Sequence, residues 1–137
     1  MSSDIRLLVL LLLLCAAPVT RADPLKIVDV DMRALDDPSM PGERLVTVRF
    51  RNESSGANAQ PTVTAAVPTD FDIVPGSARG PGASVSYSPG GGDSFVAASD
   101  WNFSEGDPVT HLRWTLPGPM EPGVAGIVSF RVRPATE

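Results

Sequence analysis

Apolar and polar residues alternate one by one in seven short segments of this 137-residue chain. The clearest run is 44–52 (RLVTVRFRN), in which Val46, Val48 and Phe50 alternate with polar residues. Because successive side chains of a strand point to opposite faces, this pattern is typical of a strand with one buried and one wet face. The pattern recurs in further segments: 26–32, 62–67, 71–74, 83–88, 109–116 and 126–133.

Glycine and proline separate these segments, and the chain contains 12 Gly and 14 Pro. They supply the fixed or positive φ angles that tight turns need. After residue 22, no window free of both residues places apolar side chains at helical spacing. The sequence therefore predicts an all-β fold, an immunoglobulin-like antiparallel β-sandwich of about seven strands. We expect Val48, Trp114 and Phe130 to point into its core.

The first 22 residues have the composition of a secretory signal. Residues 1–6 form a polar lead with a positive charge, residues 7–19 are apolar, and Thr20-Arg21-Ala22 places small residues where a signal peptidase cleaves. Pro18 leaves the apolar run shorter than the ~20 residues of a membrane span. We therefore expect residues 1–22 to be removed, giving a periplasmic or secreted protein that is not integral to the membrane. An uncleaved anchor is the alternative.

The charge and the cysteine content of the chain argue against binding to nucleic acid or anionic membranes and against a disulfide. Removing two arginines and one aspartate with the leader changes the formal net charge from −5 to −6. An acidic domain has no electrostatic footprint for nucleic acid or for an anionic membrane surface. The single cysteine, Cys15, lies in the leader, so no disulfide is expected. Exported domains without cysteine are commoner in bacteria than among small secreted animal domains, which depend on disulfides.

No catalytic constellation stands out, and we expect no enzyme activity, no cofactor and no metal. A general base needs a nucleophile and an orienting group within reach, and the single histidine, His111, shares its polar face with Arg113 and Thr115. A hydrolase would need carboxylates to converge in one cleft, with one pKa raised. Its candidates are Asp70, Asp93, Asp100 and Glu105.

Residues 41–134 resemble the bacterial conserved repeat domain, a domain of unknown function with an immunoglobulin-like fold. Four stretches carry the resemblance: 45–67, 67–78, the hairpin 85–95 (VSYSPGGGDSF) and the closing pair 110–116 (THLRWTL) with 121–132 (EPGVAGIVSFRV). The resemblance implies a surface or periplasmic location and no catalytic residues. Together with the leader, it divides the chain into a signal peptide (1–22), an N-terminal strand and linker (23–40) and the sandwich domain (41–137).

Two groups of residues are candidates for contact with a ligand or partner. Trp101 and Phe103 lie outside any alternating run, where aromatic rings either stack on a sugar or anchor a protein, or else plug one end of the sandwich. Five arginines occupy outward positions of three strands and would form a stripe if those strands were neighbours, unless acidic side chains of the same face pair with them. They are Arg49, Arg51, Arg113, Arg131 and Arg133.

Acidic and asparagine motifs carry weaker hypotheses. The cluster Asp29, Asp31, Asp36 and Asp37 is the densest acidic group, and it is either a calcium site or a solvated strand face that discourages edge pairing. Asn52-Glu53-Ser54 and Asn102-Phe103-Ser104 fit the glycosylation pattern but are ordinary turn asparagines in a bacterial protein.

These observations predict an exported, non-enzymatic immunoglobulin-like module with a structural or protein-interaction role at the bacterial cell envelope. A glycan-binding module is the alternative. We expect it to act by contact with a partner strand along an exposed edge, with a copy of itself, or with a glycan.

Overall fold

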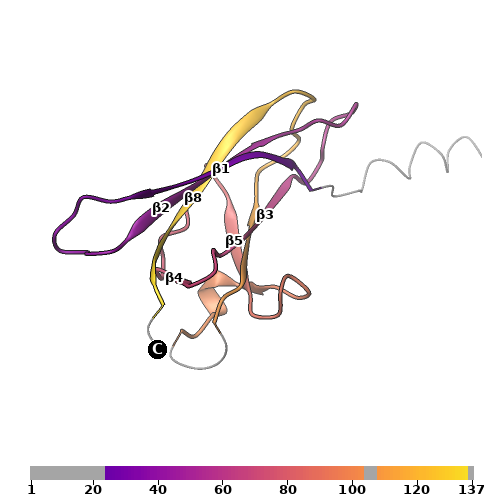
Figure 1. Cartoon of the computed structure of the whole chain (residues 1–137). Helices are drawn as coiled ribbons and strands as arrows, with labels where there is room; N and C mark the ends of the chain where they lie inside the picture. The colour runs from indigo at the N-terminus through magenta and orange to yellow at the C-terminus, as the bar shows by residue number, and fades with distance from the viewer. Residues whose placement is uncertain (1–23, 104–107, 136–137) are drawn as a thin grey trace, which may run out of the picture.

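The protein is described here by a computed structural model covering residues 24–103 and 108–135, so the leader and Glu105 lie outside it. The predicted β-sandwich is confirmed: two antiparallel four-stranded sheets stack face to face (Figure 1). One sheet has the strand order β1-β2-β8-β4 and the other β3-β7-β5-β6. The strands are β1 Lys26–Ala34, β2 Arg44–Arg51, β3 Thr62–Ala66, β4 Phe71–Ile73, β5 Ser84–Ser88, β6 Val96–Ala97, β7 His111–Thr115 and β8 Ala125–Pro134, and a short 3-10 helix, η2, spans Ala98–Asp100.

All seven alternating segments contain a strand of the structure, with ends that differ by at most two residues from the alternating runs. The additional strand is β6, which has two residues and pairs with β5 through Tyr87 and Val96. Two residues are too few to display a period, so alternation in the sequence does not reveal this strand.

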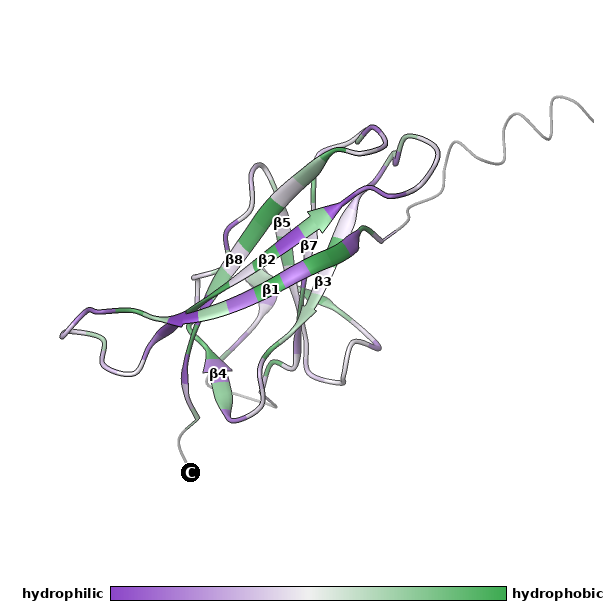
Figure 2. Cartoon of the chain, turned by 45° about the horizontal axis from the view of Figure 1, so that its top comes forward, coloured by the Kyte–Doolittle hydropathy of each residue, from purple (hydrophilic) through white to green (hydrophobic). Residues whose placement is uncertain are grey.

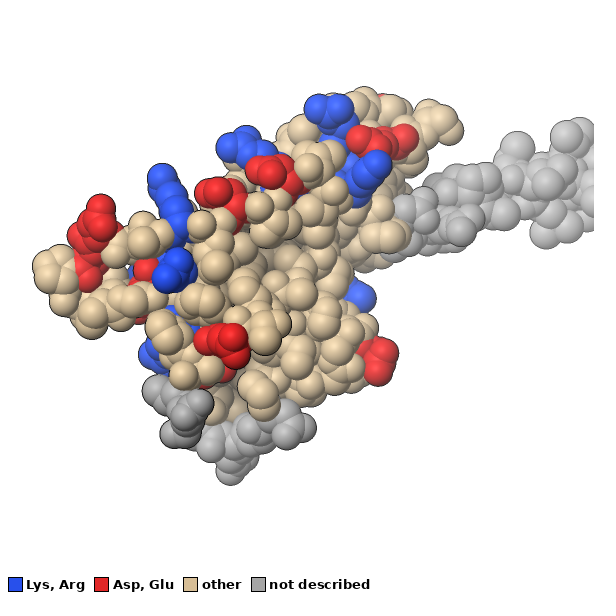
Figure 3. Space-filling model, viewed as in Figure 1, with Lys and Arg blue, Asp and Glu red and all other residues tan. Residues whose placement is uncertain are grey.

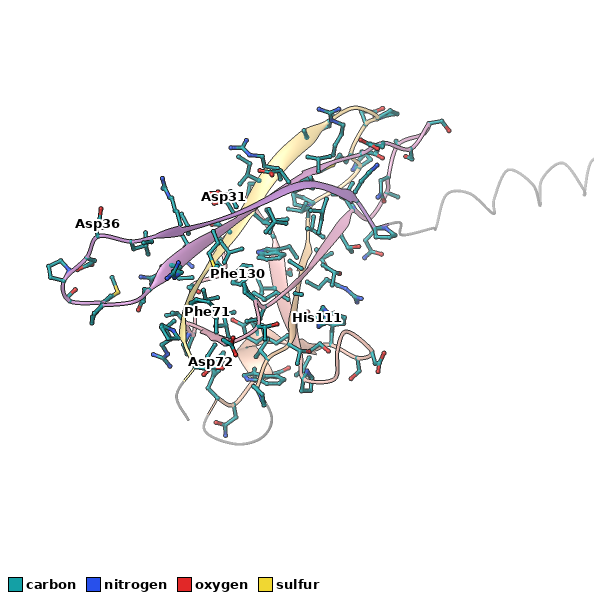
Figure 4. The ribbon with its side chains drawn as sticks, in the orientation of Figure 1. Asp31, Asp36, Phe71, Asp72, His111 and Phe130 are labelled. Atoms are coloured by element: carbon teal, nitrogen blue, oxygen red, sulfur yellow. The ribbon has the colours of Figure 1, made fainter. Side chains whose placement is uncertain are left out.

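The core is built by the inward faces that alternation predicts. Val48, Trp114 and Phe130 are all fully buried. Figure 4 shows Phe130 lying between the two sheets, and the ring of Trp114 from the other sheet packs against it with centroids 5.9 Å apart. The indole Nε1 of Trp114 has no hydrogen-bond partner among the described residues.

The centre of the first sheet is the β2–β8 pair, and one glycine is essential to how it packs. Gly126 lies directly opposite Phe50. A Cβ at position 126 would lie only 2.6 Å from the ring atom Cζ of Phe50. The missing side chain therefore lets the Phe50 ring lie across β8.

The exposed edges of the two sheets are unequal. Edge strands β6, β4 and β3 have two, three and five residues, whereas β1 has nine. Figure 1 shows the β1–β2 hairpin projecting beyond the rest of the sandwich, and Figure 2 shows polar and apolar residues alternating along β1. The N-terminal end of β1 is held to the other sheet, because the Leu25 N–H donates to the Thr62 carbonyl at 2.8 Å.

Candidate functional site

The arginines predicted to form one stripe are divided between the two sheets. Arg49 and Arg51 on β2 share the outer face of the first sheet with Arg131 and Arg133 on β8. Arg113 lies on β7, which belongs to the second sheet. The expectation of a five-residue stripe is therefore wrong for Arg113, because strand order is not encoded in the alternation of each strand.

The four arginines that do share a face are partly neutralised. Arg131 pairs with Glu43 at 3.2 Å, and Arg49 pairs with Asp29 at 3.7 Å. Within the described ranges Arg51 and Arg133 make no ion pair of this kind. Figure 3 shows acidic and basic side chains interleaved along this side of the molecule. Two of the four arginines on this face, Arg49 and Arg131, are thus paired with acidic side chains.

Arg113 has an aromatic partner instead. Its guanidinium lies over the ring of Phe95, 3.8 Å from the ring centre, and its Nε donates to the Thr64 hydroxyl at 3.4 Å. A cation held on a ring face in this way is stabilised by the ring quadrupole. The side chain is therefore engaged within its own sheet.

A shallow hollow of 320 Å³ lies on the outer face of β1, β2 and β8. Its rim carries the guanidinium-bearing residues Arg49 and Arg51, and its apolar lining includes Val28 and Ile127. These two aliphatic side chains are 45% and 44% exposed. The hollow thus combines positive charge with uncovered apolar surface.

A β-bulge in β1 changes which residues share a face. Ile27 faces Phe50 and Val30 faces Val48, but Val28 is the extra residue between them and lines the outer hollow beside Asp29. Alternation predicts one face for Val28, Val30 and Met32, and for Val28 this expectation is wrong, because a bulge sets two consecutive residues opposite one partner residue.

The apolar row that remains on the inner face of β1 is uncovered. Val30 and Met32 lie opposite the buried Val48 and Val46, yet they are 56% and 39% exposed. The reason is architectural: β1 is the outermost strand of its sheet, and its distal half projects past the second sheet (Figure 1). Sequence reasoning missed this surface, because periodicity shows which face is apolar and not whether anything covers it.

Trp101 and Phe103 belong to an aromatic cluster that closes one end of the sandwich. With Tyr87 they form three edge-to-face contacts, with ring centres 5.6 to 6.2 Å apart. Tyr87 is buried and Trp101 packs against the core, whereas Phe103 is 43% exposed. Burial raises the pKa of the Tyr87 phenol, and a hydrogen bond from the Gly76 backbone acts in the opposite direction. The plug interpretation therefore fits Trp101, and Phe103 keeps an accessible ring.

A second open hollow, of 430 Å³, lies where β4 approaches the start of β7, and its lining includes Asp70, Asp72 and His111. Figure 4 shows Asp72 and His111 on different strands. The His111 Nδ1 is 3.0 Å from the Thr110 hydroxyl, which accepts from the Gly91 N–H at 2.8 Å and donates to the Ser88 carbonyl at 3.0 Å. His111 is thus tied into a turn. Of the four hydrolase candidates, Asp70 alone lines this hollow, and Glu105 lies outside the described residues.

The acidic cluster is dispersed along the β1–β2 hairpin. Asp29 pairs with Arg49, and Asp31 lies farther along β1 opposite Thr47. The Asp37 carboxylate accepts hydrogen bonds from the Ser39 hydroxyl and N–H at 2.7 and 3.0 Å, and these bonds lower its pKa. No three potential metal-ligating side chains gather in the part of the chain that the structure describes.

Asn52 has a structural use. It is 3% exposed, its Nδ2 donates to the Met120 carbonyl at 2.8 Å, and its Oδ1 accepts from the Ser54 hydroxyl at 2.7 Å. These bonds join the turn after β2 to the segment that precedes β8. The second Asn-x-Ser sequence ends at Ser104, outside the described residues.

No protein-family model, curated protein or solved structure matches this chain. Within residues 24–103 and 108–135, none of the structure has the length and apolar character of a membrane-spanning helix.

Proposed function

We propose that the protein is an exported, non-enzymatic β-sandwich module, with an immunoglobulin-like fold, that acts structurally or by protein contact at the bacterial cell envelope. The observation that carries the proposal is the long edge strand β1 with its uncovered apolar side chains, Val30 and Met32. A strand edge presents a row of backbone donors and acceptors that another chain can extend. Apolar side chains beside such an edge add affinity to that contact.

Export is proposed from the leader, residues 1–22, and the envelope location from the resemblance of residues 41–134 to the conserved repeat domain. A role by contact is supported by the shape of the surface. The two hollows described above are open and shallow, and Arg49 on the rim of the first is already paired with Asp29. Enzyme sites more commonly enclose the greater part of their ligand.

The proposal is tested in a Gram-negative host that expresses the full chain. We expect periplasmic recovery of a form that begins at Asp23, shown by fractionation and N-terminal sequencing. A photoreactive amino acid at position 30 should then give covalent protein adducts in intact cells, and the same group at the exposed Asp93 should not. Cytoplasmic recovery would contradict export, and equal or absent adducts from the two positions would contradict contact through β1.

A glycan-binding role is the second candidate, and the accessible ring of Phe103 favours it. An exposed aromatic ring can stack on a sugar face. The matched pair is Phe103→Ala against Phe95→Ala, because Phe95 is covered by Arg113. Retention on envelope polysaccharide that falls only with Phe103→Ala would support the glycan role, and equal retention by both variants and the unaltered protein would remove it.

A further inference from the structure

Among the described residues β1 is an edge strand, and its free edge has a defined set of backbone groups without a partner strand. The Leu35 N–H donates to the Glu43 carbonyl at 3.1 Å, so backbone groups of odd-numbered residues in this part of the hairpin point toward β2. Because pairs along an antiparallel ladder alternate, the N–H and C=O groups of Val30, Met32 and Ala34 point away from β2. These three residues therefore present an intact edge beyond the bulge at Val28.

Charged side chains alternate with the edge residues along β1, and their order allows two antiparallel copies of the strand to pair opposite charges. Asp31 and Arg33 lie on the outer face between the edge residues, opposite Thr47 and Leu45 of β2. Within the described residues neither side chain makes an ion pair. Two opposite charges two residues apart on one strand can each face the other's copy when a second identical strand pairs antiparallel.

We propose that the occupant of the β1 edge is a second copy of this chain, paired antiparallel about a two-fold axis at Met32. In this register Asp31 of each copy faces Arg33 of the other. Met32 faces its own copy, and Val30 faces Ala34 of the second copy. Val30, Met32 and Ala34 of both copies exchange about six backbone hydrogen bonds. This proposal rests on the proposed function, because it names the protein that β1 contacts.

The charges distinguish this register from its neighbours. An axis at Val30 sets Asp31 against Asp29 of the second copy, and an axis at Asp31 sets that carboxylate against itself. An axis at Arg33 sets two guanidiniums together. Like charges directly opposite destabilise a strand pair. The register with its axis at Met32 pairs Asp31 with Arg33 twice and opposes no like charges.

The same register explains the exposed apolar row. The first sheet would continue from β1 of one copy into β1 of the other. Met32 would then contact its own copy beside Val30 and Ala34, on the inner face that the second sheet leaves open. An isologous contact of this kind closes after two copies and leaves no further β1 edge free.

Two charge-reversal variants test the register. Asp31→Arg and Arg33→Asp each replace two attractive pairs by two repulsive ones, and neither breaks an ion pair seen within the described chain. By sedimentation equilibrium of the exported form, each variant alone should dimerise at least about tenfold more weakly than the unaltered protein. The double variant, Asp31→Arg with Arg33→Asp, restores both pairs and should dimerise normally. Asp93→Arg, an exposed change on the other sheet's hairpin, is the matched control and should change nothing.

An equimolar mixture of the two single variants is the decisive sample. The Asp31→Arg chain carries arginine at both positions 31 and 33, and the Arg33→Asp chain carries aspartate at both. Each variant is weak alone, but in a mixed pair every arginine of one chain faces an aspartate of the other, so a mixed dimer should form. Its formation also shows that both variants are folded.

Three results would overturn the proposal: an unaltered protein that stays monomeric up to about 1 mM, single variants that dimerise normally, or a mixture that does not associate. If the protein is monomeric but still gives position-30 adducts in cells, the occupant is a different protein and the proposed function stands. If the adducts are absent too, both fail.

Discussion

Replacing Gly126 by alanine should destabilise the protein, although a glycine-to-alanine change commonly raises the free energy of unfolding where alanine fits without strain. A Cβ at position 126 would lie 2.6 Å from the Phe50 Cζ and 3.2 and 3.3 Å from the two Cε atoms. Carbon atoms pack best at about 3.5–4.0 Å, so the ring has to retreat by about 1 Å. Phe50 is 2% exposed, and the ring therefore moves into side chains that are already packed.

Overpacking of this kind lowers the free energy of unfolding by about 1–3 kcal/mol. Alanine also restricts the unfolded chain more than glycine does, which raises the free energy of unfolding by about 0.4–1 kcal/mol. We expect a net loss of about 1–2 kcal/mol in the free energy of unfolding. For a domain of this size that lowers the melting temperature by about 4–8 °C. Urea titration followed by circular dichroism measures the free energy, and a thermal scan measures the melting temperature.

Gly56→Ala is the matched control, because a Cβ there would meet nothing within 4 Å. It should be neutral or slightly stabilising. Phe50→Leu supplies the second side of a double-mutant cycle: it removes the ring atoms that clash, so Gly126→Ala should cost less in that background by at least about 0.5 kcal/mol. A loss below about 0.5 kcal/mol for Gly126→Ala alone, or strict additivity with Phe50→Leu, would refute the packing argument.

Three further predictions concern buried polar groups. Trp114→Phe should lower the free energy of unfolding by less than about 2 kcal/mol, because it removes an indole N–H that has no partner among the described residues. Truncation to alanine should cost about 3–5 kcal/mol. Urea unfolding of both variants measures the difference. Asn52→Ala should cost about 2 kcal/mol in the same assay, since the Met120 carbonyl loses one of its two donors and the Ser54 N–H loses its acceptor, and an unchanged midpoint would contradict that role. Tyr87 is the chain's single tyrosine, and its raised pKa means that the unfolded state releases the phenol proton first. The stability contributed by Tyr87 should therefore be fully present below the unfolded pKa of about 10 and fall as the pH rises above it. Phenolate absorbance should appear at a higher pH in the folded protein than in urea. The pH dependence of the free energy of unfolding should be reduced in Tyr87→Phe.

The sandwich could be predicted from the sequence because both of its sheets have one wet face. Alternation in β2, β7 and β8 places Val48, Trp114 and Phe130 inside, and all three are buried. The pattern is a direct record of burial on one side of each strand. It holds wherever a second sheet covers that side.

The surface could not be predicted in the same way. The five-arginine stripe required β7 to neighbour β2 or β8, and strand order depends on long-range pairing that no single strand records. The bulge at Val28 is one residue long and shifts a side chain without breaking the apolar pattern. Val30 and Met32 have the sequence signature of core residues and the exposure of surface ones, because the distal half of β1 projects past the other sheet.

The pairing of β2 with β8 also determines when the sheet can form. Arg44 faces Val132 and Arg51 faces Ala125, so the two central strands of this sheet come from opposite ends of the domain. A chain that emerges amino end first, from a ribosome or a translocation channel, holds β2 without that neighbour until residue 132 is out. Closing so long a loop is slow compared with forming a hairpin. The apolar face of β2 is therefore exposed, and prone to aggregation, until synthesis or transport has delivered β8.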